Sequence, residues 1–200
     1  MPDRSIPYHN IIMRLAAIPP QPRFPLPAGY AFRGWQAGDE ARWAALETEI
    51  GDFGTQREAM VYFQERCLPQ PGELQRRFIG VENAAGGLAG AVIAWYETVG
   101  GIKTSVLHWL AVSPARQGTG LGKALVREAL RRYRALEGPP VYLHTQPWSY
   151  VAVGLYSACG FRILKSETFC GYENQYEAAM AVLQKHMRPE AFGRLVAEAE

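Results

Sequence analysis

The sequence lacks the features that mark several classes of protein. Lys and Arg number 21 and Asp and Glu number 19, so the formal net charge is only +2. Such a balance offers no electrostatic attraction for nucleic acid or an anionic membrane, and we expect neither as a partner. No apolar run approaches the roughly 18 residues of a membrane span. A signal-peptide h-region is also missing, because Arg14 and prolines follow Ile11 and Ile12.

Cysteine is scarce as well. Cys67, Cys159 and Cys170 have neither metal-ligand spacing nor the arrangement of a disulfide framework. We therefore expect no metal site and a reducing, cytoplasmic location. What the chain does have is a 48% hydrophobic, 20% charged composition over 200 residues, which suits one well-filled globular domain or at most two small ones.

Proline is concentrated at the start, where half of the 14 prolines lie in the first 27 residues. Because proline fixes φ and removes an N–H donor, residues 19–27 are predicted to be an extended surface segment. We interpret residues 1–27 as an arm ahead of the domain. Ile11, Ile12 and Leu15 would pin this arm to a surface or contact another subunit, and both roles stay open.

From residue 28 onward, strand-like and helix-like patterns alternate without an internal repeat. Strands are expected at residues 30–35, 74–81, 88–96, 104–112, 141–144 and 161–164. Helices are expected at residues 39–50, 57–67, 121–136 and 150–159, with a helical tail at 173–187 and 191–199. Before the tail, this order predicts one mixed α/β domain rather than two domains.

The stretch from Val106 to Leu125 is the most informative. A strand runs into a glycine-rich turn, and the turn opens an amphipathic helix. Gly118, Gly120 and Gly122 would let backbone N–H groups approach an anion, and the positive end of the helix dipole favours negative charge there. The sequence therefore predicts a phosphate or pyrophosphate site, although tight packing alone also explains such a turn.

Two common nucleotide motifs do not fit this turn. In a Walker A loop, Gln117 would occupy the place of the first glycine, and Ala124 would replace the Ser or Thr that holds Mg²⁺. A dinucleotide motif that starts at Gly118 would need a glycine at position 123, which is Lys123. An unrelated nucleotide-binding α/β protein stays an alternative, and it predicts binding of ATP or NAD.

The pattern that remains is Q-x-x-G-x-G, formed by Gln117, Gly120 and Gly122 after a strand ending Leu-Ala-Val-Ser-Pro. It resembles the coenzyme A signature of the GNAT superfamily of N-acetyltransferases. Residues 150–161 are similar to a later helix of that family, with its A-x-x-L-Y-x-x-x-G-F ending, and residues 33–46 to its opening strand and helix. The resemblance covers about residues 28–172 and leaves 173–200 as a C-terminal helical extension.

The resemblance implies both a fold and an activity. The fold would be a mixed α/β (α+β), mostly antiparallel central sheet flanked by helices, with the coenzyme in a cleft between two splayed strands. The activity would be an acyltransferase reaction, in which acetyl-CoA donates an acetyl group directly to a primary amine of a small molecule or peptide. A catalytically silent acyl-CoA-binding module of the same fold is the alternative.

The resemblance also implies which residues contact the coenzyme. The strand end would pair with the pantetheine arm and offer an amide to the thioester oxygen, and the turn would hold the pyrophosphate. Ser149 stands where many relatives have a coenzyme-contacting Asn, so that contact departs from the family pattern. The full predicted set is Leu110, Ala111, Val112, Arg116, Gln117, Gly118, Thr119, Gly120, Leu121, Gly122, Lys123, Ser149 and Tyr156.

Tyr156 matches the family position that protonates the leaving sulfur, so we predict it as general acid; a core tyrosine is the alternative. His108 and Glu97 are the predicted candidates for the base, with His144 as a further one, and a structural histidine is the alternative for both imidazoles. Aromatic residues expected to border the acceptor favour an amine with an apolar body or a peptide terminus: Trp95, Tyr96, Trp109, Trp148 and Tyr150. The arm and the tail would cover the acceptor side or form a homodimer contact.

Overall fold

A computed structural model describes residues 3, 5–20 and 24–200 of the chain. The chain forms two compact units. The first unit holds Pro20–Trp95 and Leu107–Leu136, and the second holds Pro2–Pro19, Tyr96–Val106 and Glu137–Glu200. Two long strands contribute one part of their length to each unit.

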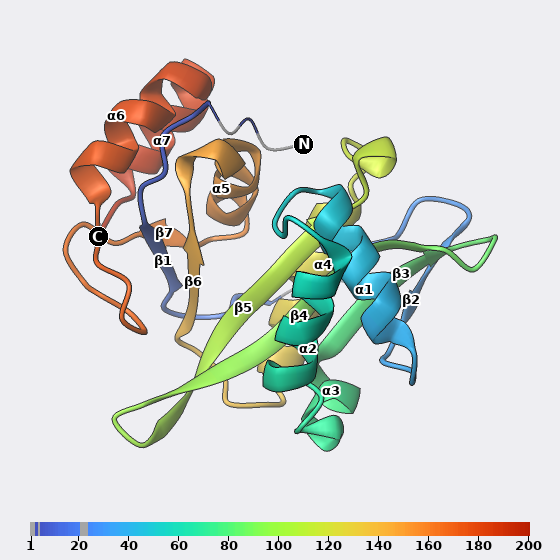
Figure 1. The fold of residues 1–200 in the computed structure, drawn as a ribbon. Coiled ribbons are helices and arrows are strands. Elements are labelled where there is room, and N and C mark those ends of the chain that lie inside the picture. Colours follow the sequence, from blue (N-terminus) through green and yellow to red (C-terminus); the bar gives the residue numbers. More distant parts are fainter. Residues whose placement is uncertain (1–2, 4, 21–23) are drawn as a thin grey trace. The chain divides into compact units, whose positions relative to one another are not determined.

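In the first unit, the strands of the sheet follow the order β2-β3-β4-β5 (Figure 1). β2 (Tyr30–Arg33) pairs antiparallel with β3 (Phe78–Asn83), and β3 pairs antiparallel with β4 (Leu88–Val99). β4 and β5 (Ile102–Val112) are the strands that continue into the second unit. β4 is buried without interruption from residue 89 to 95, which requires cover on both faces of the sheet.

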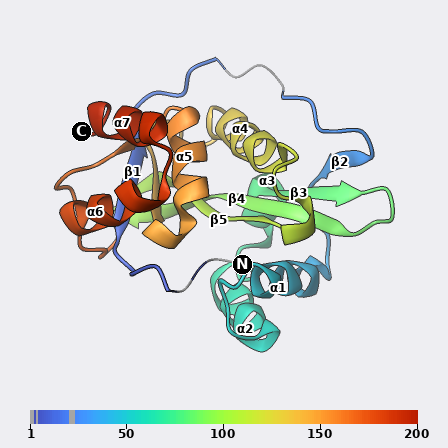
Figure 2. The same cartoon turned by 90° about the horizontal axis from the view of Figure 1, so that it is seen from above.

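Helices provide that cover. α1 (Asp39–Glu49) and α2 (Gln56–Arg66) lie on one face of the sheet of the first unit, and α4 (Leu121–Tyr133) lies on the other, as Figure 2 shows. α2 begins at a capping box, in which the Thr55 hydroxyl accepts from the Glu58 N–H and the Glu58 carboxylate accepts from the Thr55 N–H. The buried face of α4 consists of Leu121, Ala124, Leu125, Val126, Ala129, Leu130 and Tyr133.

The sequence pattern indicated a strand over residues 74–81, and this prediction was wrong for its first half, which belongs to α3 (Pro71–Arg77). The chain is helical up to Arg77, and β3 begins only at Phe78. Pro71 occupies the first turn, where a missing N–H costs no intrahelical bond. The fully buried guanidinium of Arg77 donates to Glu73 Oε2 at 2.6 Å. This i, i+4 pairing is a helical contact, so it favours a helix over a strand.

The core of the first unit is rich in aromatic side chains. Trp35 stacks on Phe63 with ring centroids 5.1 Å apart, and Trp43 lies 4.8 Å from the same ring. Rings of this size bury more apolar area than aliphatic side chains, which stabilises the packing of α1 and α2 on the sheet. The other buried members are Ala44, Leu46, Ala59, Cys67, Leu74, Phe78, Ala91, Ile93, Trp95 and Ala111.

In the second unit, the strand order is β4-β5-β6-β1-β7. β5 pairs in parallel with β6 (Val141–Thr145), and its pairs match Ser105 with Val141 and Val106 with Tyr142. β1 (Ile11–Leu15) pairs antiparallel with β6 and with β7 (Arg162–Ile163). The predicted fold class, a mixed and mostly antiparallel sheet flanked by helices, is therefore confirmed.

Three helices belong to the second unit, α5 (Tyr150–Ala158), α6 (Tyr176–His186) and α7 (Pro189–Ala197). A short 3-10 helix, η2 (Pro147–Ser149), leads into α5. α6 and α7 lie next to each other in both Figures 1 and 2. The tail predicted to be helical thus contains two helices, each with bounds a few residues from the expected ones.

β1 differs from the arm predicted over residues 1–27. Its apolar side chains Ile11, Ile12, Met13 and Leu15 are at most 4% exposed. Three consecutive buried residues require cover on both faces, which only a strand inside a sheet receives. Residues 11–15 therefore belong to the sheet and do not precede it. Residues 1, 2, 4 and 21–23 of the predicted arm lie outside the described residues.

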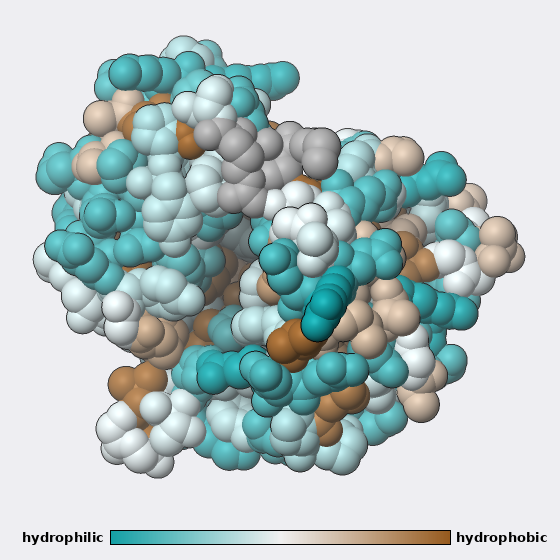
Figure 3. Space-filling model, viewed as in Figure 1, coloured by the Kyte–Doolittle hydropathy of each residue, from teal (hydrophilic) through white to brown (hydrophobic). Residues whose placement is uncertain are grey.

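Each helix in the described part of the chain is too short or too polar to cross a bilayer. The face shown in Figure 3 is mainly hydrophilic or intermediate in hydropathy, and its hydrophobic residues form small separate patches. Apolar side chains are instead concentrated in the buried set described above.

Candidate active site

The end of β5 contains the residues predicted to pair with the coenzyme. Leu110 and Val112 are half-buried, and Ala111 is buried. Directly before them, Trp109 has a φ of 54°, in the left-handed region that a bulky side chain rarely adopts. Backbone conformations of this kind persist where the surrounding structure enforces them, and they concentrate at functional sites.

Gly90 explains how closely β4, β5 and α4 pack at this strand end. A Cβ on Gly90 would lie 2.9 Å from the carbonyl oxygen of Ala111 and 3.0 Å from Cδ1 of Leu125. Only the absence of a side chain lets the backbone of β5 come this close. The start of α4 is therefore held directly beside the end of β5.

Hydrogen bonds from side chains to nearby backbone carbonyls stabilise the turn between β5 and α4. It contains a 3-10 helix, η1 (Pro114–Arg116), after which Gln117 Nε2 donates to the Val112 carbonyl at 3.1 Å. The Thr119 hydroxyl donates to the Arg116 carbonyl at 2.6 Å. Gly118 and Gly120 have φ values of 77° and 92°, which glycine adopts without the steric penalty of a Cβ.

α4 begins without a side-chain cap. Gly120 is the N-cap, and the first hydrogen bond of the helix runs from the Ala124 N–H to the Gly120 carbonyl at 3.1 Å. The N–H groups of Leu121, Gly122 and Lys123 therefore have no acceptor inside the helix. Uncapped amides at the positive end of a helix dipole suit a phosphate group, and the predicted phosphate site stays a prediction.

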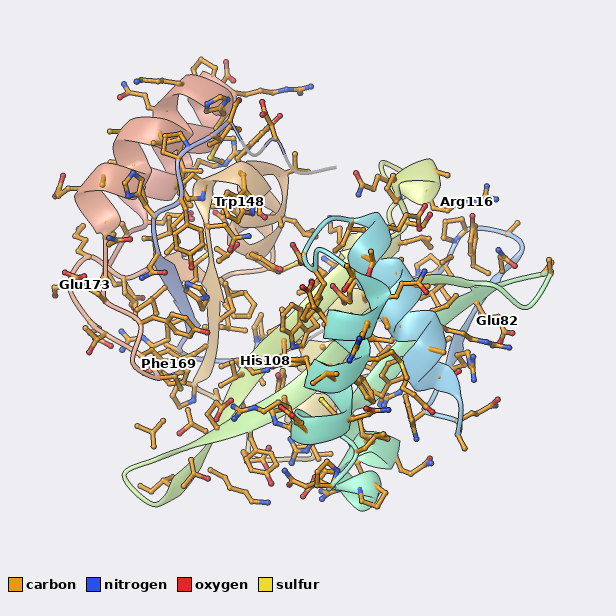
Figure 4. All side chains as sticks on the ribbon, in the orientation of Figure 1. Glu82, His108, Arg116, Trp148, Phe169 and Glu173 are labelled. Carbon is orange, nitrogen blue, oxygen red and sulfur yellow. The ribbon has the colours of Figure 1, made fainter. Side chains whose placement is uncertain are left out.

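Cationic side chains border this turn. Lys123 Nζ and Arg127 Cζ lie 5.5 Å and 5.2 Å from the ring centroid of Phe24, distances typical of cation–π contacts. Phe24 Cε1 is also 3.7 Å from the position of a Cβ on Gly120. Arg116 lies exposed at the end of η1 (Figure 4). The sequence pattern did not single out Phe24, because it lies within the proline-rich stretch.

His108, a predicted candidate for the base, lies on β5 in the first unit and is half-buried (Figure 4). The next residue, Trp109, connects β5 to α2, because its indole Nε1 donates to the Tyr62 hydroxyl at 3.1 Å. The Tyr62 and Trp109 ring centroids are 4.9 Å apart. The glycine-rich turn, the end of β5 and His108 therefore all lie in the first unit.

α1 carries a buried carboxyl group that the sequence interpretation missed. Glu47 is fully buried, and this burial, with a smaller contribution from the charge of Asp52, raises the pKa of Glu47 well above its ordinary value. The available signal was its position one helical turn after Trp43, on the apolar face of the predicted helix. A carboxyl group there is exceptional among buried residues.

Three predicted site residues lie in the second unit. The Tyr156 side chain on α5 is 8% exposed, and its ring lies 6.0 Å from that of Phe161. Ser149, just before α5, accepts at Oγ from Gln146 Nε2 at 2.9 Å. Glu97 is half-buried on the part of β4 that belongs to this unit. The roles of all three stay predictions.

His144 also lies in the second unit, among aromatic rings near the end of β6. Its Nε2 is 2.9 Å from Asn10 Oδ1, and its ring stacks on Tyr172 with centroids 3.7 Å apart. Burial lowers the pKa of His144 to about 4. An imidazole with so low a pKa is poorly matched to accepting a proton near neutral pH, so this geometry favours the structural interpretation of His144.

Residues 3, 5–20 and 24–200 contain no group of three or more His, Cys, Asp or Glu side chains placed to hold a metal ion. Cys67, Cys159 and Cys170 are all free thiols.

A mixed sheet in which a strand leads through a glycine-rich turn into an uncapped helix is an arrangement suited to a phosphate-bearing ligand. The chain belongs to the acetyltransferase (GNAT) family, since the sequence model of that family matches residues 35–161. The enzymes of this family are acetyltransferases that use acetyl-CoA as co-substrate.

Named proteins agree with this assignment. Mycothiol acetyltransferase from Salinispora tropica is 30% identical over 148 residues, which are 71% of this chain and 48% of that protein. A GCN5-related N-acetyltransferase from Sphaerobacter thermophilus matches with a TM-score of 0.61 and 21% identity, over 78% of this chain and 50% of the other. A mutant of the spermidine N-acetyltransferase of Vibrio cholerae has a TM-score of 0.50 and 22% identity, over 67% and 80% of the two chains.

The chain covers only part of some of these relatives. The chain spans about half the length of the mycothiol acetyltransferase and of the Sphaerobacter protein. At 21% and 22% identity, the two solved structures show a shared fold.

Proposed function

We propose that the chain is an N-acetyltransferase that moves an acetyl group from acetyl-CoA directly to a primary amine of a small molecule or peptide. The observation that carries the proposal is the uncapped start of α4 behind the glycine-rich turn. Its backbone amides would donate to a diphosphate, and the chain belongs to an acetyltransferase family.

The residues present fit the coenzyme. The amides between Gln117 and Lys123 would hold the pyrophosphate, and Arg116 and Lys123 would add positive charge beside it. The backbone of Leu110, Ala111 and Val112 would pair with the pantetheine arm, and Ser149 and Tyr156 would supply further contacts. When bound, acetyl-CoA supplies an acetyl group that is already activated as a thioester.

The chemistry that falls to the protein is electrostatic and acid–base. An amide at the end of β5 would donate to the thioester oxygen, and such a fixed donor is typically worth about 3 kcal/mol in the transition state. A C–N bond forms and a C–S bond breaks, so one proton leaves the amine nitrogen and one reaches the sulfur. Tyr156 is the proposed general acid for the sulfur, and His108 and Glu97 are the proposed acceptors of the amine proton.

The names of the relatives support an amine acceptor. One similar protein is a mycothiol acetyltransferase and another is a spermidine N-acetyltransferase. The aromatic residues of α1, α2 and β5 suit an acceptor whose amine is attached to an apolar body.

We also retain the proposed bounds of the acetyltransferase domain, 28–172, with 173–200 as an extension, and add to the domain β1, which lies between β6 and β7. The match to the family over residues 35–161 falls inside these bounds. The three free thiols accord with the proposed cytoplasmic location. A homodimer contact of the terminal segments stays a prediction.

Release of free coenzyme thiol from acetyl-CoA across a panel of primary amines tests the function, in parallel with calorimetric titration of coenzyme A. We expect binding of the coenzyme and turnover with at least one amine. Binding without turnover on any amine would point to a silent acyl-CoA-binding module. Preferential binding of ATP or NAD would overturn the coenzyme assignment.

A further inference from the structure

α1 encloses two polar groups that have no hydrogen-bond partner within the described part of the chain. They are the carboxyl group of Glu47, with both oxygens unpaired, and Nε1 of Trp43. Both side chains are fully buried, and they lie one helical turn apart, so they share one face of the helix. Buried polar groups are nearly always paired, so two unpaired groups on one helix face need an explanation, and a bound ligand would supply the missing partners.

The same face of α1 meets three more aromatic rings. The Trp43 centroid lies 5.8 Å from Phe53, 6.3 Å from Tyr62 and 5.7 Å from Trp109. Phe53 and Tyr62 lie 5.1 Å and 4.9 Å from Trp109. We call these four residues the Trp109 cluster. Phe53, Tyr62 and Trp109 are only half-buried, so the cluster has a side that solvent reaches, while Trp43 and Glu47 form its interior.

A buried Glu47 carboxylate would need a positive counter-charge. No ion pair of the described residues involves Glu47, and the acidic neighbour Asp52 makes a negative charge on Glu47 more costly still. A cation that enters with a ligand would supply the missing counter-charge. Aromatic ring faces also attract cations, which adds to the same preference.

The position of the cluster links it to the transfer reaction. Trp109 immediately precedes Leu110, the first residue of the strand end that is proposed to hold the thioester. The backbone of Trp109 is left-handed, and its ring packs against Trp43 of α1 and Tyr62 of α2. A ligand among these rings would therefore contact a residue that is covalently joined to the thioester-binding segment.

We propose that Glu47 and the Trp109 cluster form the acceptor subsite, which takes a primary amine that is cationic at neutral pH and carries an aromatic or similarly apolar body. The ammonium group binds Glu47 as a carboxylate, so the proton that burial favours on the free side chain leaves to solvent as the cation enters. The body of the amine lies against Phe53, Tyr62 and Trp109. An oxygen on the same ligand would pair with Trp43 Nε1. This inference rests on the proposed acetyl transfer, but its binding step is separable from turnover.

Two isomeric amines test the subsite. 2-Phenylethylamine is cationic at neutral pH, whereas 4-ethylaniline has the same atoms and is neutral. We expect E47Q to weaken the calorimetric affinity for 2-phenylethylamine by about tenfold or more, with KM raised in parallel, because the variant keeps the shape of the carboxyl group and removes its charge. Affinity for 4-ethylaniline and for coenzyme A should change by less than about twofold.

Two further variants make the result specific. E65Q makes the same charge change at an exposed position of α2 and should leave both amines unaffected. Glu47→Asp keeps the charge on a shorter side chain and should restore part of the selectivity for the cationic amine. Equal behaviour of E47Q and E65Q, equal weakening of both amines by E47Q, or absence of 2-phenylethylamine binding to the original protein would each overturn the subsite.

The outcomes also separate the two proposals. Binding of 2-phenylethylamine that depends on Glu47, without acetylation of any amine, would support the subsite and contradict the transfer reaction. Acetylation of amines without any dependence on Glu47 would support the transfer reaction and contradict the subsite.

Discussion

Single residues carry the most specific chemistry of this chain, but only some of them could be predicted from its sequence. Gln117, Gly120 and Tyr156 could be selected because a motif fixes their spacing. Trp109 could be named only as one of several aromatic residues expected to border the acceptor, and Glu47 could not be named at all, because the sequence shows neither the left-handed backbone of one tryptophan nor the burial of one carboxyl group. Both properties arise from contacts between segments that are distant in the sequence.

Tyr156→Phe tests the proposed general acid. The substitution removes one hydroxyl from a largely buried ring and keeps its packing against Phe161. We expect kcat to fall by about a hundredfold, because proton transfer to the leaving group typically contributes that much, while the affinity for acetyl-CoA stays nearly the same. Steady-state kinetics with calorimetry measure both quantities. Tyr176→Phe on α6 is the control, and unchanged turnover in Tyr156→Phe would remove the role.

His144 should make the free energy of unfolding depend on pH. Burial lowers its pKa to about 4 in the folded chain, whereas an exposed imidazole titrates near 6.5. The unfolded chain therefore binds a proton that the folded chain excludes between these values. Stability from this group is complete above about pH 6.5 and is lost as the pH falls toward 4.

Urea unfolding of the original chain and of His144→Phe across this pH range measures the effect. The variant keeps a ring against Tyr172 and cannot titrate, so its stability should fall less steeply. Because solvent screens part of the shift, we expect a difference of about 1–2 kcal/mol over the range. Parallel profiles of the two proteins would show that His144 does not contribute.

At the scale of elements, local signals decided which segments could be predicted. α2 has its capping box and α4 has a continuous apolar stripe, so both were predicted within a few residues. α3 was mistaken for a strand, because a seven-residue helix is too short for its period to appear. β1 was taken as an arm, since its five residues have no neighbouring strand in the sequence.

Gly120→Ala tests the turn that opens α4. The residue has a φ of 92°, and its new Cβ would make only an ordinary contact with Phe24 at 3.7 Å. The substitution therefore acts through the backbone, which an alanine tends to rotate out of the left-handed region. We expect affinity for coenzyme A to fall by about tenfold, as measured by calorimetry, because the amides after Gly120 lose their common direction.

Gly29→Ala is the matched control for this substitution. Gly29 has a φ of 84° and also has room for a Cβ, so it carries the same backbone cost away from the turn. Its variant should lose a similar amount of stability, about 1 kcal/mol, with no loss of coenzyme affinity. Equal losses of affinity in both variants would contradict the assignment of the turn.

At the scale of the whole molecule, the sequence was sufficient for the family and the fold class, because strand, turn and helix signatures recur at fixed distances over residues 35–161. The position of β1 between β6 and β7 was not predictable, since strand order depends on pairings between segments far apart in the chain. The acceptor subsite was not predictable either, because it unites α1, α2 and β5.

Met13→Ala tests whether β1 is an integral strand. Met13 is fully buried and is paired with Leu143 on one side and Ile163 on the other. We expect the free energy of unfolding to fall by about 2–4 kcal/mol, as is usual when a buried Met becomes Ala. Val151→Ala, at a position that is 73% exposed, should cost less than about 0.5 kcal/mol. Equal losses in urea unfolding would mean that β1 contributes little.

The membership of residues 11–15 in the sheet also has a consequence for biosynthesis. On the ribosome, this segment is made before both of its neighbours, because Met13 pairs with Leu143 and Ile163, which are encoded about 130 and 150 residues later. At about 5–20 residues per second, the nascent segment waits for roughly 6–30 seconds before both neighbours can cover its apolar side chains. During that interval, a chaperone that recognises short apolar stretches has its best opportunity to bind this chain.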